Sequence, residues 1–316
     1  MPVMRIAFMG TPDFAVPSLR GLNASNHDVA LVVTQPDRPA GRGRRLRPPA
    51  VKVAATELGL PVVQYDDVNS DEALKGLREA EIDALVVVAF GQILSSELLD
   101  LPSRGCVNLH ASLLPRYRGT APINWAIVDG EKETGVTTMF MAPKVDAGEI
   151  ILQRKTEIPD DETAGSLSER LASIGADLLV ETLDLVERGE APRARQDASL
   201  STYARKLKRS DGEIDWSQPT RKVLDRIRGM TPWPGAYTWY GGKILRVERA
   251  EAGGTSGGRP GEVVALDGEA LEVATADGSV RLLDLCPEGK SSMGADAFCR
   301  GYRPLVGTRP FMKPEN

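Results

Sequence analysis

Residues 84–90, Ala-Leu-Val-Val-Val-Ala-Phe, are an uninterrupted apolar run. A strand with one solvated face alternates apolar and polar side chains, so a run that is apolar on both faces predicts a central parallel strand covered by helices on both sides. Further strand signals recur at residues 4–9, 29–34, 61–64, 106–111 and 134–141, with helical signals at 50–59, 71–80, 121–128 and 166–188. This alternation predicts an α/β fold with a Rossmann-like, mostly parallel sheet and helices on both faces. A capping-box pattern, Ser166-Leu-Ser-Glu169, places the start of the long helix at Ser166.

The pattern of predicted elements changes after residue 190. Residues 190–209 are polar and rich in arginine and lysine, which is typical of a linker. One helical signal follows at 218–228, and then short strands near 235–240, 243–250, 261–266, 270–275 and 279–285, separated by glycine-rich turns. Short strands at this spacing predict a small, OB-like β-barrel. Because 316 residues are enough for two cores, we expect a catalytic α/β domain at 1–189, a linker at 190–209 and a β-barrel domain at 210–316.

Composition excludes several classes of protein. No apolar run reaches the ~18 residues that a membrane-spanning helix needs, so no membrane contact is expected. The three cysteines are far apart and form no Cys-x-x-Cys pattern, which predicts neither a disulfide framework nor a metal site and fits a reducing cytoplasm. A net charge of −5 argues against a generally basic surface, so a nucleic-acid partner would have to be bound by local basic patches. Nothing in the sequence requires an oligomer, and we expect a monomer.

The strand signal at residues 105–119 carries the first candidate site. Side chains alternate faces along a strand, so Asn108, His110 and Ser112 should share one face. They lie where the strand ends before Pro115, and open α/β sheets bind ligands at the carboxyl ends of their strands. The plainer alternative is an edge strand with a solvated polar face. His110 is one of only two histidines in the chain and follows an apolar run, which favours the site.

Asp146 is the third candidate, in the turn that follows the strand at 134–141. Its plainer role is Asx-turn chemistry, but its strand can lie beside the strand of His110. Asn108 would then donate an N–H to an oxygen that gains charge, which is worth roughly 3–4 kcal/mol in other acyl-transfer sites. His110 changes charge near neutral pH, and Asp146 can favour the imidazolium or move protons through a water. No serine or cysteine is paired with the histidine as a nucleophile, so this trio predicts direct group transfer.

Residues 35–50 interrupt the α/β pattern with a loop crowded by arginines. Proline and glycine exclude a helix there, and the loop contains Arg38, Arg42, Arg44, Arg45 and Arg47. Such a loop can be simply solvated. Five like charges at this density repel each other unless a polyanion is their neighbour, which makes the loop a candidate nucleic-acid contact.

The pattern Asn-x-His-x-Ser-Leu-Leu-Pro at 108–115 resembles the active-site signature of the formyltransferases that use 10-formyltetrahydrofolate. The resemblance covers nearly the whole chain. It implies that Asn108, His110 and Asp146 are catalytic, that 10-formyltetrahydrofolate is the formyl donor, and that no metal is needed. It also implies two groups of folate contacts, which are Ser112, Leu113, Leu114 and Pro115 after the catalytic strand, and Phe90, Gly91, Gln92, Ile93 and Leu94 after the central strand.

The loop Gln35-Pro-Asp-Arg-Pro-Ala-Gly-Arg-Gly-Arg-Arg45 resembles that of the family members that act on tRNA. The implied acceptor is the α-amino group of initiator methionyl-tRNA, and the product is N-formylmethionyl-tRNA for translation initiation. The expected tRNA contacts are Arg38, Arg42, Arg44, Arg45, Lys206 and Lys208, with further contacts from the β-barrel. The alternatives are a formyltransferase of the same family that acts on a sugar-nucleotide amine, a hydrolase that uses water, and a non-catalytic RNA- or folate-binding protein.

Overall fold

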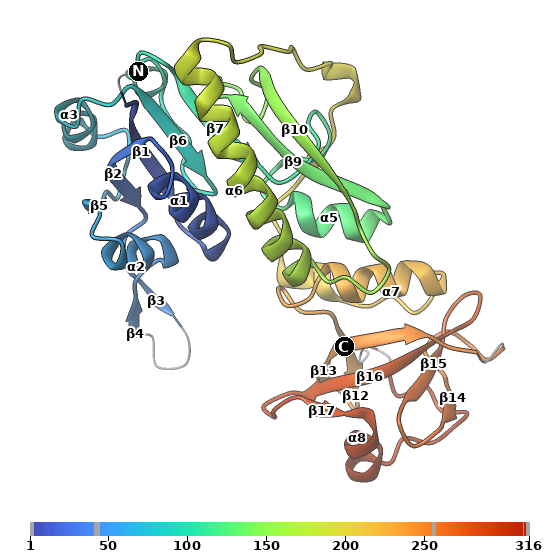
Figure 1. Ribbon diagram of the computed structural model, residues 1–316. Helices are drawn as coiled ribbons and strands as arrows, with labels where there is room; N and C mark the ends of the chain where they lie inside the picture. The colour runs from blue at the N-terminus through green and yellow to red at the C-terminus, as the bar shows by residue number, and fades with distance from the viewer. Residues whose placement is uncertain (1–2, 41–44, 255–256, 312, 314–316) are drawn as a thin grey trace. The chain divides into compact units, whose positions relative to one another are not determined.

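The computed structural model describes residues 3–40, 45–254, 257–311 and 313 (Figure 1). The chain divides into two compact units, which are described separately. The first unit comprises residues 1–122, 133–157 and 168–204, and the second comprises 123–132, 158–167 and 205–316. Helix α5 (Pro122–Asp129) therefore belongs almost entirely to the second unit, although its neighbours in the sequence form the sheet of the first.

A seven-stranded sheet forms the centre of the first unit, in the order β10-β9-β7-β6-β1-β2-β5. Five strands are parallel: β1 (Arg5–Gly10), β2 (Asp28–Thr34), β5 (Val62–Gln64), β6 (Ala84–Val88) and β7 (Cys106–His110). The strand β9 (Glu133–Phe140) runs antiparallel to β7, and β10 (Ile150–Glu157) runs antiparallel to β9. The expected mostly parallel sheet is confirmed, and the apolar run at 84–90 supplies its central strand.

Helices cover both faces of this sheet, as the sequence predicts. On one face, Leu74 and Leu77 of α3 (Asp71–Glu79) and Leu98 of α4 (Ser96–Leu99) join one core cluster with β-strand residues such as Val87. On the other face, α6 (Ala164–Arg188) packs closely on β7 and runs beside α1 (Val16–Asn23) (Figure 1). The helix α2 (Ala50–Glu57) contacts α1, β2 and β5.

Two local expectations are wrong. The long helix begins at Ala164, not at Ser166, because Thr163 caps it: Thr163 Oγ1 accepts from the Ser166 N–H at 3.2 Å, and Ser166 Oγ accepts from the Thr163 N–H at 3.1 Å. The described residues of the arginine-rich segment are also not all irregular. Its strands β3 (Arg38–Ala40) and β4 (Arg45–Arg47) form an antiparallel hairpin in which Arg38 faces Arg47.

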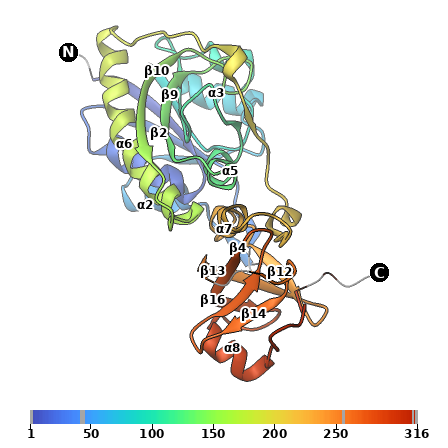
Figure 2. The same cartoon turned by 90° about the vertical axis from the view of Figure 1, so that its right-hand side faces the viewer.

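The second unit is built on a curled antiparallel sheet (Figure 2). Its strands are β12 (Tyr237–Tyr240), β13 (Lys243–Ala252), β14 (Val263–Leu266), β15 (Leu271–Ala274), β16 (Ser279–Pro287) and β17 (Met293–Gly294), and its helices include α7 (Thr220–Gly229) and α8 (Ala295–Tyr302). The strand order is β12-β13-β16-β15-β14, so β12 and β14 are the edge strands. The chain after α8 bonds to both: the Val263 N–H of β14 donates to the Thr308 carbonyl, and Thr238 Oγ1 of β12 donates to the Phe311 carbonyl. These contacts make the sheet barrel-like, which confirms the expected fold class.

Within the described part of the chain, no helix combines the length and the apolar character that a membrane span requires.

The close packing of α6 on β7 generates a stability prediction. A Cβ at Gly175 would lie 2.7 Å from Leu109 Cδ2, whereas a Cβ at Gly21 in α1 would have its nearest neighbour at 3.8 Å. Both positions are helical, so alanine brings a similar gain in helix propensity at each. We expect Gly175→Ala to be less stable than Gly21→Ala by about 1–3 kcal/mol of unfolding free energy, because overpacking displaces the buried leucine. Urea denaturation measures the difference, and equal stabilities would contradict the close contact.

Candidate active site

Asn108 and His110 lie on one face of β7, as expected from the alternation of the strand. The alternative of a solvated edge strand is wrong, because β7 is paired on both sides, with β6 and with β9, and His110 is only 7% exposed. The carboxyl ends of the parallel strands meet here. Thr11, directly after β1, donates from Oγ1 to the carbonyl of Phe90, which follows β6, at 2.9 Å.

The ring of His110 is oriented by a backbone carbonyl. Its Nε2 lies 2.9 Å from the carbonyl oxygen of Tyr117. A carbonyl oxygen can only accept a hydrogen bond, so Nε2 carries a hydrogen in the neutral and in the charged imidazole. The other nitrogen, Nδ1, is therefore the one that can accept a proton, and it faces Asp146 Oδ2 at 3.8 Å. That separation exceeds a hydrogen bond, but it is short enough for strong attraction once the ring is charged.

Asp146 reaches this ring by an indirect path. Because β9 is antiparallel to β7, it ends at Phe140 opposite Val107, near the start of β7. Residues 141–149 must therefore turn back to bring Asp146 to the far end of the strand. The carboxylate is held there by the Gly119 N–H, which donates to Oδ2 at 2.8 Å. This partner is distant in sequence, so the Asx-turn alternative does not describe the bond that Asp146 makes.

Asn108 is half-buried and has a fixed amide orientation. Its Nδ2 donates to the carbonyl of Val87 on β6 at 3.1 Å. An asparagine amide has two N–H donors, and this bond engages one of them. The second N–H can therefore donate to a ligand oxygen without any change in the bond to β6.

Of the four predicted folate contacts in the turn after β7, two are buried and two are partly exposed. Ser112 is 1% exposed and its Oγ donates to the Arg116 carbonyl at 2.7 Å, so it serves the turn itself. Leu114 is also buried, and its carbonyl accepts from Gln153. Leu113 and Pro115 are partly exposed, and they are the members of this group whose side chains reach the surface.

The loop after β6 shows the same division. Phe90 and Leu94 belong to the core cluster, whereas Gly91 is exposed and Ile93 is 70% exposed. Gln92 fixes the loop from within, because its Oε1 accepts from the Val68 N–H at 2.8 Å. The loop thus presents an apolar side chain and a bare glycine backbone at the edge of the sheet.

The arginine hairpin has a polar base. Lys52 Nζ donates to Asp37 Oδ1 at 2.8 Å and to Gln64 Oε1 at 2.7 Å, and Gln64 Nε2 donates to Asp37 Oδ1 at 2.8 Å. The hydrogen bonds from Lys52 and Gln64 lower the pKa of the Asp37 carboxyl. Arg38 is exposed, and its Nη2 donates to Gln35 Oε1.

The other predicted tRNA contacts are placed as follows. Arg42 and Arg44 lie outside the described residues, and Arg45 is described only by its backbone in β4. Lys206 and Lys208 are exposed and belong to the second unit, on either side of the buried Leu207.

A further segment that borders the site could not be recognised from the sequence. Residues 193–204, here called the strap, pack against both segments that hold the trio. Ala194 bonds to Ile150 in an antiparallel bridge, and β11 (Tyr203–Ala204) pairs with β8 (Arg118–Gly119). The strap is polar and irregular, so no periodicity marks it as structural.

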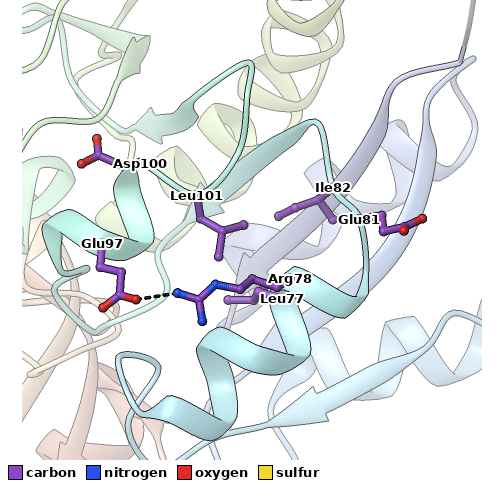
Figure 3. Close-up of a pocket in the computed structure, with 7 residues that line it drawn as sticks. All are labelled: Leu77, Arg78, Glu81, Ile82, Glu97, Asp100 and Leu101. Carbon is purple, nitrogen blue, oxygen red and sulfur yellow. Dashed lines mark hydrogen bonds and ion pairs between the residues drawn. The ribbon is translucent and has the colours of Figure 1, made fainter.

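Two further features lie outside the trio. Burial raises the pKa of the Cys106 thiol to about 12, which makes this neighbour of Asn108 a poor nucleophile. A pocket in the first unit is lined by residues of α3, α4 and the adjoining turns, with an ion pair between Arg78 and Glu97 (Figure 3). It contains none of the candidate residues. Among the described residues, no three His, Cys, Asp or Glu side chains are grouped as metal ligands.

Two family models match the chain. Residues 4–183 match the formyl transferase family, and residues 206–303 match the C-terminal domain of formyl transferase. A methionyl-tRNA formyltransferase from Moorella thermoacetica is 53% identical over 304 residues, covering 96% of this chain and 97% of that protein. One from Geotalea daltonii is 50% identical over 306 residues, covering 97% and 98%.

Solved structures show the same fold at lower identity. HypX from Aquifex aeolicus in complex with tetrahydrofolic acid has a TM-score of 0.65 and 21% identity over 99% of this chain, which spans about half of that protein (50%). An N-formyltransferase from Helicobacter canadensis, in complex with folinic acid and dTDP-3-aminofucose, has a TM-score of 0.65 and 18% identity, covering 89% of this chain and 99% of that one.

The close approach of the strap to β8 predicts an intolerance at Gly119. Its φ is +112°, and a Cβ would lie 2.6 Å from the Ala204 carbonyl oxygen. Gly59 also has a positive φ, +70°, but has nothing within 4 Å of a Cβ. We expect Gly119→Ala to destabilise the protein by about 1–3 kcal/mol more than Gly59→Ala, because it adds a backbone clash to the strain.

Hydrogen exchange gives a local measure of the same effect. The Thr120 amide donates to Ala204 at 2.9 Å, so it should exchange faster in Gly119→Ala and at the native rate in Gly59→Ala. Equal exchange in both variants would mean that the strap does not depend on this contact.

Proposed function

This chain belongs to the formyl transferase family, and from that premise we propose that it transfers the formyl group of 10-formyltetrahydrofolate to the α-amino group of initiator methionyl-tRNA. The product is N-formylmethionyl-tRNA, which serves translation initiation. Relatives named methionyl-tRNA formyltransferase, at 46–53% identity over at least 94% of the chain, support this acceptor. The sugar N-formyltransferases among the similar structures are only 18–19% identical, so a sugar-nucleotide amine is less well supported.

The observation that carries the chemistry is the geometry of His110 and Asp146. The Tyr117 carbonyl fixes Nε2 of the ring, and the Gly119 N–H fixes the carboxylate, so that Nδ1 and Oδ2 face each other at 3.8 Å. This arrangement places a carboxylate oxygen beside the ring nitrogen that can accept a proton. Such a pair can stabilise a developing oxyanion and accept a proton in the same step.

In the proposed reaction the methionyl nitrogen attacks the formyl carbon of 10-formyltetrahydrofolate. The free N–H of Asn108 and the charged His110 stabilise the oxyanion that forms on the formyl oxygen. Asp146 takes the proton that the amine loses, directly or through a water. When the tetrahedral intermediate collapses, the bond from carbon to N10 breaks, N10 takes up the proton that Asp146 accepted, and tetrahydrofolate leaves. No covalent enzyme intermediate is required.

We assign folate binding to the two segments that border the trio, Phe90–Leu94 and Ser112–Pro115. The exposed Ile93 and Gly91 and the partly exposed Leu113 and Pro115 are suited to an apolar ring. The buried Phe90, Leu94, Ser112 and Leu114 would act through their backbone and by holding the loops. The remaining member, Gln92, ties its loop to Val68.

We assign tRNA binding to the arginine hairpin and to the second unit. The proposed contacts are Arg38, Arg42, Arg44, Arg45, Lys206 and Lys208. In this division residues 1–189 carry catalysis together with the tRNA contacts of the arginine hairpin. Lys206 and Lys208 lie in the joining segment 190–209, and residues 210–316 add further tRNA contacts. We propose that the enzyme acts as a monomer in the cytoplasm, where translation uses its product.

One assay tests the function. The protein is incubated with 10-formyltetrahydrofolate in the presence and absence of methionyl-tRNA, and tetrahydrofolate, formate and N-formylmethionyl-tRNA are measured. The proposal requires formylated tRNA in amounts equal to the tetrahydrofolate formed. Release of formate without tRNA would identify a hydrolase, and no turnover in either case would identify a binding protein.

The catalytic trio generates a kinetic prediction. His110→Ala and Asp146→Asn should each lower kcat at least a hundredfold, roughly the lower end of what positioned acid–base groups contribute. Asn108→Ala should lower kcat by about 10²–10³ through loss of its donor. The affinity for folate should stay near the native value, measured by equilibrium titration. Near-native turnover of any of the three variants at saturating substrates would contradict its assignment.

The arginine hairpin generates a prediction of salt dependence. Arg38→Ala and Arg42→Ala should raise KM for methionyl-tRNA most strongly at low salt, because each lost phosphate contact flattens the slope of log affinity against log salt by about 0.7–0.9. Initial rates against tRNA concentration at several salt concentrations measure the slope. Arg78→Ala, which removes one arginine from α3, is the matched control and should leave both values unchanged. If both hairpin variants keep the native slope of log affinity against log salt, the hairpin does not contact the tRNA.

A further inference from the structure

Gln196 differs from its neighbours in the strap. Residues 192–195 and 197–200 are all exposed, whereas Gln196 is partly buried. Its Nε2 donates to the Asp146 carbonyl at 3.0 Å and to the Gly148 carbonyl at 2.8 Å. Both donors of the amide are therefore engaged with the loop that carries the candidate catalytic carboxylate.

The other end of this amide is fixed by a buried arginine. Arg118 is 2% exposed, and its guanidinium donates to Gln196 Oε1 from Nη2 at 2.6 Å and from Nε at 3.1 Å. Arginine has only donors and keeps its charge. The oxygen of the amide must therefore face Arg118, and its nitrogen must face the loop of Asp146.

The loop that carries Asp146 has other restraints at its two ends: the Met141 N–H donates to the Cys106 carbonyl, and Glu149 pairs with Arg193 of the strap at 3.0 Å. Residues 141–149 lie beyond the end of β9, and Asp146 has a φ of +50°, which is uncommon for residues other than glycine. The Gly119 N–H holds the carboxylate of Asp146, and Gln196 holds the backbone on which that carboxylate is mounted. Both restraints involve the strap: Gln196 belongs to it, and Gly119 pairs with its residue Ala204.

We propose that Gln196 is a positioning residue for Asp146, and that Arg118 orients it. The inference rests on the proposed function, and it assigns to Gln196 a role in catalysis without contact with the substrates. Without the two donors, the carbonyls of residues 146 and 148 lose their partners and the carboxylate moves relative to His110. A displacement of about 1 Å in a reacting constellation can cost a hundredfold in rate.

Gln196→Glu is the sharpest test. Glutamate keeps the length of the side chain and still accepts from Arg118, so the buried arginine keeps a partner. An ionised carboxylate has no donors, so it repels the two carbonyls instead of binding them. We expect kcat to fall by about ten- to a hundredfold, with KM for 10-formyltetrahydrofolate and for methionyl-tRNA within twofold of native and little change in Tm.

Two companion variants make the result specific. Ser199→Ala changes another side chain of the same strap, whose Oγ donates to Asp197 Oδ1 within the strap, and should keep the native kcat. Gln196→Asn keeps both kinds of hydrogen-bonding group but is one methylene shorter, so it cannot hold Arg118 and the loop together. It should lower kcat in the same direction, and it decides the question alone if Gln196→Glu does not fold.

The outcomes separate this inference from the proposed function. A native kcat in a folded Gln196→Glu or, failing that, in Gln196→Asn overturns the positioning role. A loss confined to KM also overturns it, because it would assign Gln196 to substrate binding. If the native enzyme forms no N-formylmethionyl-tRNA, the proposed function fails and this inference fails with it.

Discussion

The candidate site depends on the backbone of three residues, Tyr117–Gly119, which follow β7 and precede α5 in the sequence. One carbonyl of this segment sets the ring of His110, and one N–H sets the carboxylate of Asp146. Backbone groups are well suited to this task, because the chain fixes their direction and a carbonyl can only accept while an N–H can only donate. The tautomer of the histidine and the position of the carboxylate are thus decided before any substrate binds.

Much of the fold follows from local periodicity in the sequence. The apolar run at 84–90 predicts a central strand because nothing but burial on both faces accounts for it, and β6 occupies that place. The shared face of Asn108 and His110 follows from the alternation of a single strand. These features could be predicted because each depends on residues within one element.

The features that could not be predicted depend on partners far along the chain. The prolines and glycines of residues 35–50 suggest an irregular loop. The base of the β3–β4 hairpin is nevertheless fixed by Lys52 and Gln64, which follow it in the sequence. Gln196 is a polar residue in a polar run, and its role is visible only once Arg118 and Asp146 lie beside it. No local pattern distinguishes such a residue from a solvated one.

The antiparallel direction of β9, which lies between β7 and β10, has a consequence for the position of Asp146. A parallel strand in the place of β9 would end beside His110 and bring Asp146 there directly, without a returning loop. The antiparallel β9 ends at the opposite end of β7, so the loop 141–149 must come back across the sheet. A returning loop has no ladder of its own to fix it and needs side-chain restraints. In this chain the buried Arg118 and Gln196 of the strap supply these restraints. The strap resembles a linker in the sequence, but in the structure it borders the candidate active site.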